Sequence, residues 1–150
     1  MNIMKGTGTS EVIVLGLQPG ELLLESIIKA IDQHDIRNGM VVSGIGTLKS
    51  CTMHYINHVE FPPSDSLFRL EGPLELLSVS GVIANKEPHL HVVVSCKDEN
   101  VHGGHLEPGS EVAYLAEIVI IKADYLQMER VLDGKRKVKL LGPIEAMKAR

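Results

Sequence analysis

Three histidines near the middle of the chain have the spacing of metal ligands. His89 and His91 flank Leu90 in an apolar run that continues to Cys96. In a β-strand, residues two apart project to the same face, so the two imidazoles lie side by side while Leu90 faces the core. Neutral imidazole is the commonest transition-metal ligand in proteins, so this pair predicts part of a metal site.

The third histidine, His105, can join the pair if the chain reverses around Asp98. His105 then lies opposite His91 in an antiparallel hairpin, where opposed Cβ atoms are about 4.5–5.5 Å apart. Residues 97–100 predict an even, four-residue turn, which would point His105 to the wrong face. We therefore expect a β-bulge at Gly103-Gly104 to restore the pairing, and His102 is the alternative third ligand without that bulge.

Three histidine ligands predict an open zinc site, in which a fourth position accepts water or an external small-molecule ligand. Zinc is the first candidate because nitrogen ligands suit it, and nickel and copper remain alternatives. The competing interpretation makes His89 and His91 two surface residues on a half-exposed strand. Spacing alone does not decide between the two interpretations.

Glu117 is the candidate catalytic residue. It stands in an apolar run, residues 114–123, where a buried carboxylate without a partner would be costly. Its side chain is expected to form a salt bridge, to contact a ligating histidine, or to act as a base on a metal-bound water. The histidines at positions 34, 54 and 58 show no ligand spacing and are expected on the surface.

The rest of the sequence predicts one helix and many strands. Apolar residues recur at three- and four-residue steps between Glu21 and His34, which predicts an amphipathic helix. Strands are expected over residues 11–17, 40–48, 51–55, 67–70, 74–83, 89–96, 101–106 and 114–123. Asp133-Gly134 predicts a type I′ hairpin turn between strands 128–132 and 135–141. This order predicts an α+β fold, with a mainly antiparallel β-sheet packed against one principal helix.

Composition sets limits on the function. The 150 residues form one expected domain, 1–150, and 44% hydrophobic residues are enough for one core. A net charge of −4 disfavours binding to phosphate backbones, and 3% aromatic residues disfavour base stacking. The first residues contain no long apolar run, so we expect a cytoplasmic protein without a membrane segment.

Several segments together resemble the plant and prokaryote conserved (PPC) domain family over nearly the whole chain. They are residues 17–21 (LQPGE), 44–46 (GIG), 77–81 (LSVSG), 87–92 (EPHLHV), 103–109 (GGHLEPG) and 116–119 (AEIV). The resemblance implies a largely antiparallel α+β fold, assembly as a homotrimer, and a metal held by His89, His91 and His105. Family proteins are often labelled DNA-binding, and the plant members add AT-hook segments that this sequence lacks.

The sequence is compatible with three functions. The favoured one is a trimeric metal-binding module that holds a small ligand. The second is a DNA-binding regulatory protein without an AT-hook, which would use the basic run Lys135 to Lys139 on one strand face. The third is a metal-dependent hydrolase or lyase with Glu117 as its base.

Overall fold

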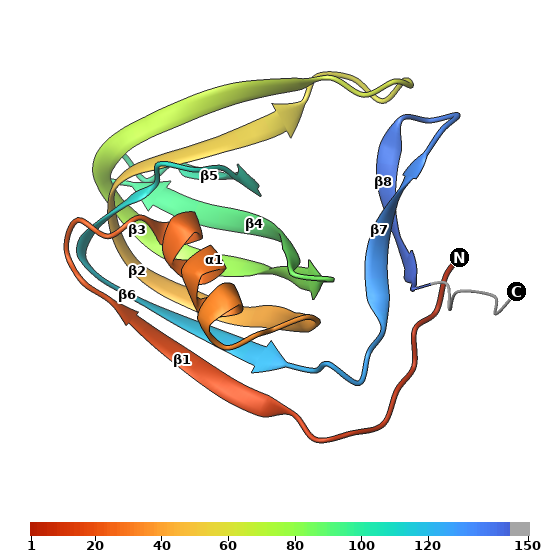
Figure 1. Ribbon diagram of the computed structural model, residues 1–150. Helices are drawn as coiled ribbons and strands as arrows, with labels where there is room; N and C mark the ends of the chain where they lie inside the picture. The colour runs from red at the N-terminus through yellow and green to blue at the C-terminus, as the bar shows by residue number, and fades with distance from the viewer. Residues whose placement is uncertain (145–150) are drawn as a thin grey trace, which may run out of the picture.

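One helix packs against a strongly curved antiparallel sheet, which confirms the predicted fold class. The computed structural model describes residues 1–144 (Figure 1). Its elements in chain order are β1 (Glu11–Leu17), α1 (Leu23–Gln33), β2 (Gly39–Ile56), β3 (Asp65–Ala84), β4 (Glu87–Cys96), β5 (Val101–Leu106), β6 (Glu111–Lys122), β7 (Met128–Asp133) and β8 (Val138–Pro143).

Two long strands give the sheet its shape. β2 has 18 residues and β3 has 20, and each joins two segments that the sequence predicts as separate strands. The main sheet has the order β1-β6-β2-β3-β4-β5, and β2 also pairs with β5. Because β2 contacts both β3 and β5, the strands β2, β3, β4 and β5 close into a ring.

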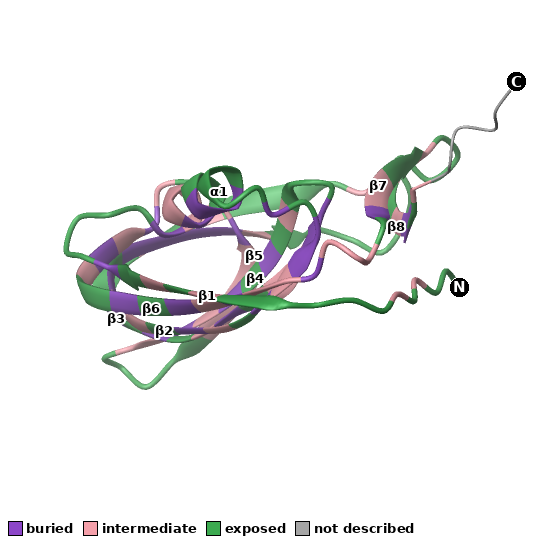
Figure 2. Ribbon diagram, turned by 60° about the horizontal axis from the view of Figure 1, so that its bottom comes forward, coloured by how far each residue is buried: buried purple, intermediate pink, exposed green. Residues whose placement is uncertain are grey.

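The core lies between α1 and the inner face of the sheet (Figure 2). Leu23, Ile27 and Ile31 on the helix are fully buried, as are Ile118 and Ile120 on β6. Each such side chain contributes about 1.5–3 kcal/mol when it leaves water. At 11 residues α1 only covers the sheet, and within residues 1–144 no helix has the length and apolar character needed to cross a bilayer.

The strands β7 and β8 form a separate two-stranded hairpin beside the main sheet (Figure 1). The predicted hairpin is therefore present, but the predicted two-residue type I′ turn is wrong. Asp133 pairs with Val138, and its Oδ1 accepts bonds of 2.9 Å from the backbone N–H groups of Lys135 and Arg136. The Asp133 carboxylate thus stabilises a longer turn. Lys135 and Lys137 lie in that turn and do not share a strand face with the lysine at position 139.

Candidate metal site

Buried and exposed side chains alternate along β4, as predicted. Leu90 and Val92 are 1% and 0% exposed, whereas His89 and His91 lie exposed on the opposite face. The apolar side chains fix this orientation, because a slip of one residue would bury the imidazoles and expose the core. The strand therefore presents both rings on one surface.

The predicted pairing of His91 with His105 is confirmed, but the mechanism that we expected for it is wrong. β4 and β5 pair without a register shift, so there is no bulge at Gly103-Gly104. The turn itself has an odd number of residues, 97–99, which gives the required register. Cys96 N–H donates to Asn100 O at 2.8 Å across this turn, and Glu99 has a φ of 68°. A three-residue turn with a left-handed last residue keeps both histidines on one face.

The same register excludes His102 as the alternative third ligand. His102 lies opposite Val94, which is fully buried, so its side chain projects from the other face of the hairpin. The ring centroids of His89, His91 and His105 are 5.4, 5.0 and 5.7 Å apart. Rings that bind one zinc ion at tetrahedral angles, through nitrogens about 2.0 Å from the metal, have centroids roughly 5 Å apart. The spacing of the three ring centroids is therefore close to that of three rings around one zinc ion.

A fourth histidine, His54, joins this group from the end of β2. It pairs with His105 across the β2–β5 contact, and the two rings stack with centroids 4.4 Å apart. We expected His54 to be an isolated surface residue, and that prediction is wrong because its side chain is only 24% exposed. We call His54, His89, His91 and His105 the histidine cluster.

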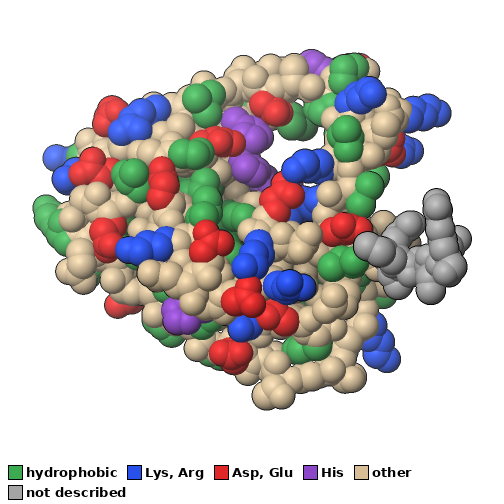
Figure 3. Space-filling model, viewed as in Figure 1, with side chains coloured by type: hydrophobic (Ala, Val, Ile, Leu, Met, Phe, Trp, Pro, Cys, Tyr) green, Lys and Arg blue, Asp and Glu red, His purple; other side chains and the backbone are tan. Residues whose placement is uncertain are grey.

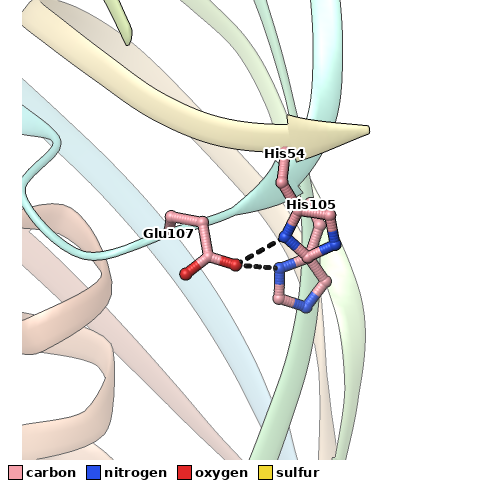
Figure 4. A group of neighbouring side chains, drawn as sticks. All are labelled: His54, His105 and Glu107. Atoms are coloured by element: carbon pink, nitrogen blue, oxygen red, sulfur yellow. Dashed lines mark hydrogen bonds and ion pairs between the residues drawn. The ribbon is translucent and has the colours of Figure 1, made fainter. Parts of the chain in front are cut away.

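Glu107 holds two of these rings in place (Figure 4). Its Oε1 atom lies 2.7 Å from Nδ1 of His54 and 3.0 Å from Nδ1 of His105. An ionised carboxylate only accepts hydrogen bonds, so in this arrangement each Nδ1–H donates to Oε1, and Nε2 is the ring atom left to bind a metal. Such carboxylate contacts are typical of metal-binding histidines.

Gly104 allows β2 to approach β5. A Cβ atom at this position would lie 2.8 Å from the backbone oxygen of His54 and 3.4 Å from the Cβ of Met53. Gly104 thus permits the close approach of two strands, which is a different role from the expected bulge.

The tightest group of ligand-type atoms found in residues 1–144 consists of His54, His105 and Glu107, whose atoms all lie within 4.8 Å of one another. The ring nitrogens of His89, His91 and His105 do not all lie within this distance of one another. Hydrogen bonds from the two rings to the carboxylate already explain the tighter group. His89, His91 and His105 have no such carboxylate between them and remain the better candidates for binding one ion.

The pKa values of His89 and His91 both lie below the ordinary histidine value. Partial burial is the main cause for each ring, and the neighbouring His105 adds repulsion between positive charges. Arg130 opposes protonation of His89 in the same way. Both shifts favour the neutral form of the ring, which is the form that binds metals.

Glu117, the candidate catalytic residue, is not brought to the histidine cluster. Its side chain is exposed, so the premise of a buried carboxylate is wrong. It pairs with Ile45 on β2, nine positions before His54, which corresponds to about 30 Å along the strand.

The histidine cluster lines a cleft of about 1050 Å³ between the main sheet and the β7–β8 hairpin. Arg130 and Lys139 line the same cleft from the hairpin. In Figure 3, histidine side chains and basic side chains both border the opening beside the hairpin. The cleft thus has imidazoles on one wall and cations on the other.

Comparison with known proteins places the chain in a family. Residues 4–124 match the Plants and Prokaryotes Conserved (PCC) domain, and the chain belongs to that family. A metal-containing protein from Archaeoglobus fulgidus is 26% identical, with a TM-score of 0.77 over 93% of this chain and 98% of that one. A PPC protein from Pyrococcus horikoshii is 26% identical, with a TM-score of 0.76 over 97% and 99% of the two chains.

A curated relative is much longer. The bifunctional protein GlmU of a Synechococcus strain is 32% identical over 121 residues, which is 81% of this chain and 18% of the relative. The chain thus spans about a fifth of that relative's length. The family match ends at residue 124, so β7 and β8 lie outside the matched residues.

Proposed function

We propose that this PCC-domain protein binds a divalent transition metal, with zinc as the first candidate, through His89, His91 and His105. The metal would keep one coordination position for a small molecule in the cleft. The observation that carries this proposal is the spacing of the three rings, 5.0–5.7 Å, on one face of the β4–β5 hairpin. The metal-containing relative from Archaeoglobus fulgidus supports it.

Glu107 has a supporting role in this proposal. By accepting a hydrogen bond from Nδ1 of His105, Glu107 fixes the orientation of this ring and leaves its Nε2 atom for the metal. The competing ligand set is His54, His105 and Glu107. The two sets share only His105, so substitutions at the remaining positions distinguish them.

Elemental analysis of the purified protein tests the proposal. We expect one metal ion per chain in the wild type and its loss in His89→Ala, His91→Ala and His105→Ala. His102→Ala is the matched control, because this histidine lies on the same hairpin but faces the other way. Metal lost from His54→Ala and retained by His91→Ala would support the competing set. A wild type without metal contradicts the proposal.

We further propose that the chain assembles as a homotrimer. Val12 and Val14 on β1 are 67% and 66% exposed, and Ile45 on β2 is 49% exposed. These side chains lie on the outer face of neighbouring strands, together with Leu115 of β6. A contiguous apolar surface of this kind is typical of contacts between subunits. The exposed Glu117 lies on the same surface.

DNA binding is the second candidate function. The exposed β7–β8 turn gathers Lys135, Arg136 and Lys137, which is the observation that favours it. Binding through these residues predicts an affinity that falls steeply with salt. A fluorescence anisotropy titration with a DNA duplex at about 50 and 200 mM salt measures this, and the net charge of −4 favours a negative result.

A further inference from the structure

The β7–β8 hairpin, which follows the residues matched by the family model, forms the second wall of the histidine cleft. Its base is anchored by Met128, which is 4% exposed and donates its N–H to Asn38 Oδ1 at 3.3 Å. Further along β7, Arg130 donates to the backbone oxygens of Glu87 at 2.8 Å and Val82 at 3.0 Å. These bonds fix the position of the guanidinium at the cleft.

The positive charge of Arg130 lacks a direct counter-charge. Within residues 1–144, no carboxylate forms an ion pair with it, and the nearby Glu87 carboxylate pairs instead with Lys139 at 2.6 Å. Arg130 is half-buried, and burial lowers the pKa of its guanidinium. A guanidinium has five N–H donors, so donors remain after the two bonds to backbone oxygens. Such a group is suited to bind an anion.

The charges around the cleft also favour an anion once a metal is bound. Arg130 and Lys139 are balanced by Glu87 and Asp65, which line the same cleft. Glu107, behind the rings, adds one negative charge. A dication bound by neutral imidazoles would therefore leave the site with one excess positive charge.

We propose that the cleft binds a small molecule that carries a carboxylate or phosphate group, with Arg130 binding the anionic oxygens beside the histidine-held metal. This inference rests on the proposed metal site and names the class of its ligand. The cleft, at about 1050 Å³, has room for more than the anionic group alone. Planar pairs of N–H donors recognise both carboxylate and phosphate, so the shared oxyanion chemistry defines the class.

Titration of the cobalt-loaded full chain with inorganic phosphate and, separately, with acetate tests the inference. We expect the visible spectrum of the cobalt ion to change as the anion binds, and calorimetry to give the affinity. Arg130→Gln is expected to weaken binding about tenfold or more, because a charge-assisted hydrogen bond is lost. Arg136→Gln is the matched control, since this arginine lies in the exposed turn of the same hairpin. The anion that binds with the higher affinity shows whether the site prefers a phosphate or a carboxylate group.

A second variant covers the case in which Arg130→Gln disturbs the hairpin. Val138 lines the cleft, so Val138→Glu places a negative charge there and leaves Arg130 unchanged. We expect it to weaken anion binding at unchanged metal content. Val131→Glu is its control, because Val131 is exposed on the same hairpin and lines a different hollow.

The outcomes separate the two proposals. Equal anion affinities in wild type, Arg130→Gln and Val138→Glu overturn the anion inference, even when every chain carries one metal. A wild type without metal contradicts the proposed function alone. In that case phosphate or acetate binding to the metal-free chain that still depends on Arg130 supports the inference, and binding that does not depend on Arg130 overturns it.

Discussion

Glu107 controls the orientation of two rings through a single oxygen atom. Replacing it by Gln removes the charge that attracts the Nδ1 protons of His54 and His105. We expect Glu107→Gln to keep one metal per chain but to lower the metal affinity about 10–100-fold. Competition with a chromophoric chelator measures this affinity, and Glu99→Gln in the exposed β4–β5 turn is the control. Complete loss of metal from this variant would instead indicate that Glu107 is a direct ligand.

The lowered pKa values of His89 and His91 predict the pH dependence of the metal-free protein. An unfolded chain protonates these rings near the ordinary value of about 6.5, whereas the folded protein protonates them only at lower pH. The unfolded state then binds more protons, so the free energy of unfolding falls as the pH drops below about 6.5. Urea denaturation at about pH 7.5 and 5.5 measures this.

The double variant His89→Asn and His91→Asn provides the comparison for this pH effect. It lacks both titrating rings, so its stability should change less between the two pH values. An identical change in the wild type and the double variant would show that other groups cause the dependence.

At the scale of the elements, Gly81 sets the distance between β3 and β4. A Cβ atom at this position would overlap the backbone oxygen of His89. We expect Gly81→Ala to lower the free energy of unfolding by about 1–3 kcal/mol, because the strands must separate, and to weaken metal binding. Gly16→Ala is the matched control, since no atom lies within 4 Å of the added methyl group. Denaturant titrations of the wild type and both variants measure these free energies of unfolding.

Local patterns predicted part of the site. The alternation around Leu90 placed His89 and His91 on one face, and the pairing of His91 with His105 followed from the hairpin. Glu107 could also have been found, because it lies two residues after His105 and so shares its face. The turn was harder, since a left-handed Glu99 has no sequence signal as clear as glycine.

His54 could not be predicted from any local pattern. Its position depends on β2 running without interruption from Gly39 to Ile56 and then pairing with β5. The sequence divides β2 into two predicted strands, and nothing in either indicates a partner so distant along the chain. The cleft was missed for a similar reason, because the placement of the β7–β8 hairpin depends on contacts such as Arg130 with Glu87.

For the whole molecule, the proposed trimer predicts a sensitive surface on β1. Val14 is 66% exposed, and Val14→Glu would place a charge within the apolar contact between subunits. We expect light scattering after size-exclusion chromatography to give the mass of three chains for the wild type and a lower mass for the variant. Leu132→Glu, at 58% exposure on β7, is the control that should leave the mass unchanged. A monomeric wild type contradicts the proposal.

The β4–β5 hairpin, residues 87–106, carries three of the four clustered histidines within one short stretch of chain. Local hairpins form early in folding, because closing a short loop costs little entropy. The proposed metal would therefore meet three of its ligands on one hairpin before the β2–β5 ring closes. Its effect on equilibrium stability will then be smaller than its affinity for the native protein implies, since both states bind it.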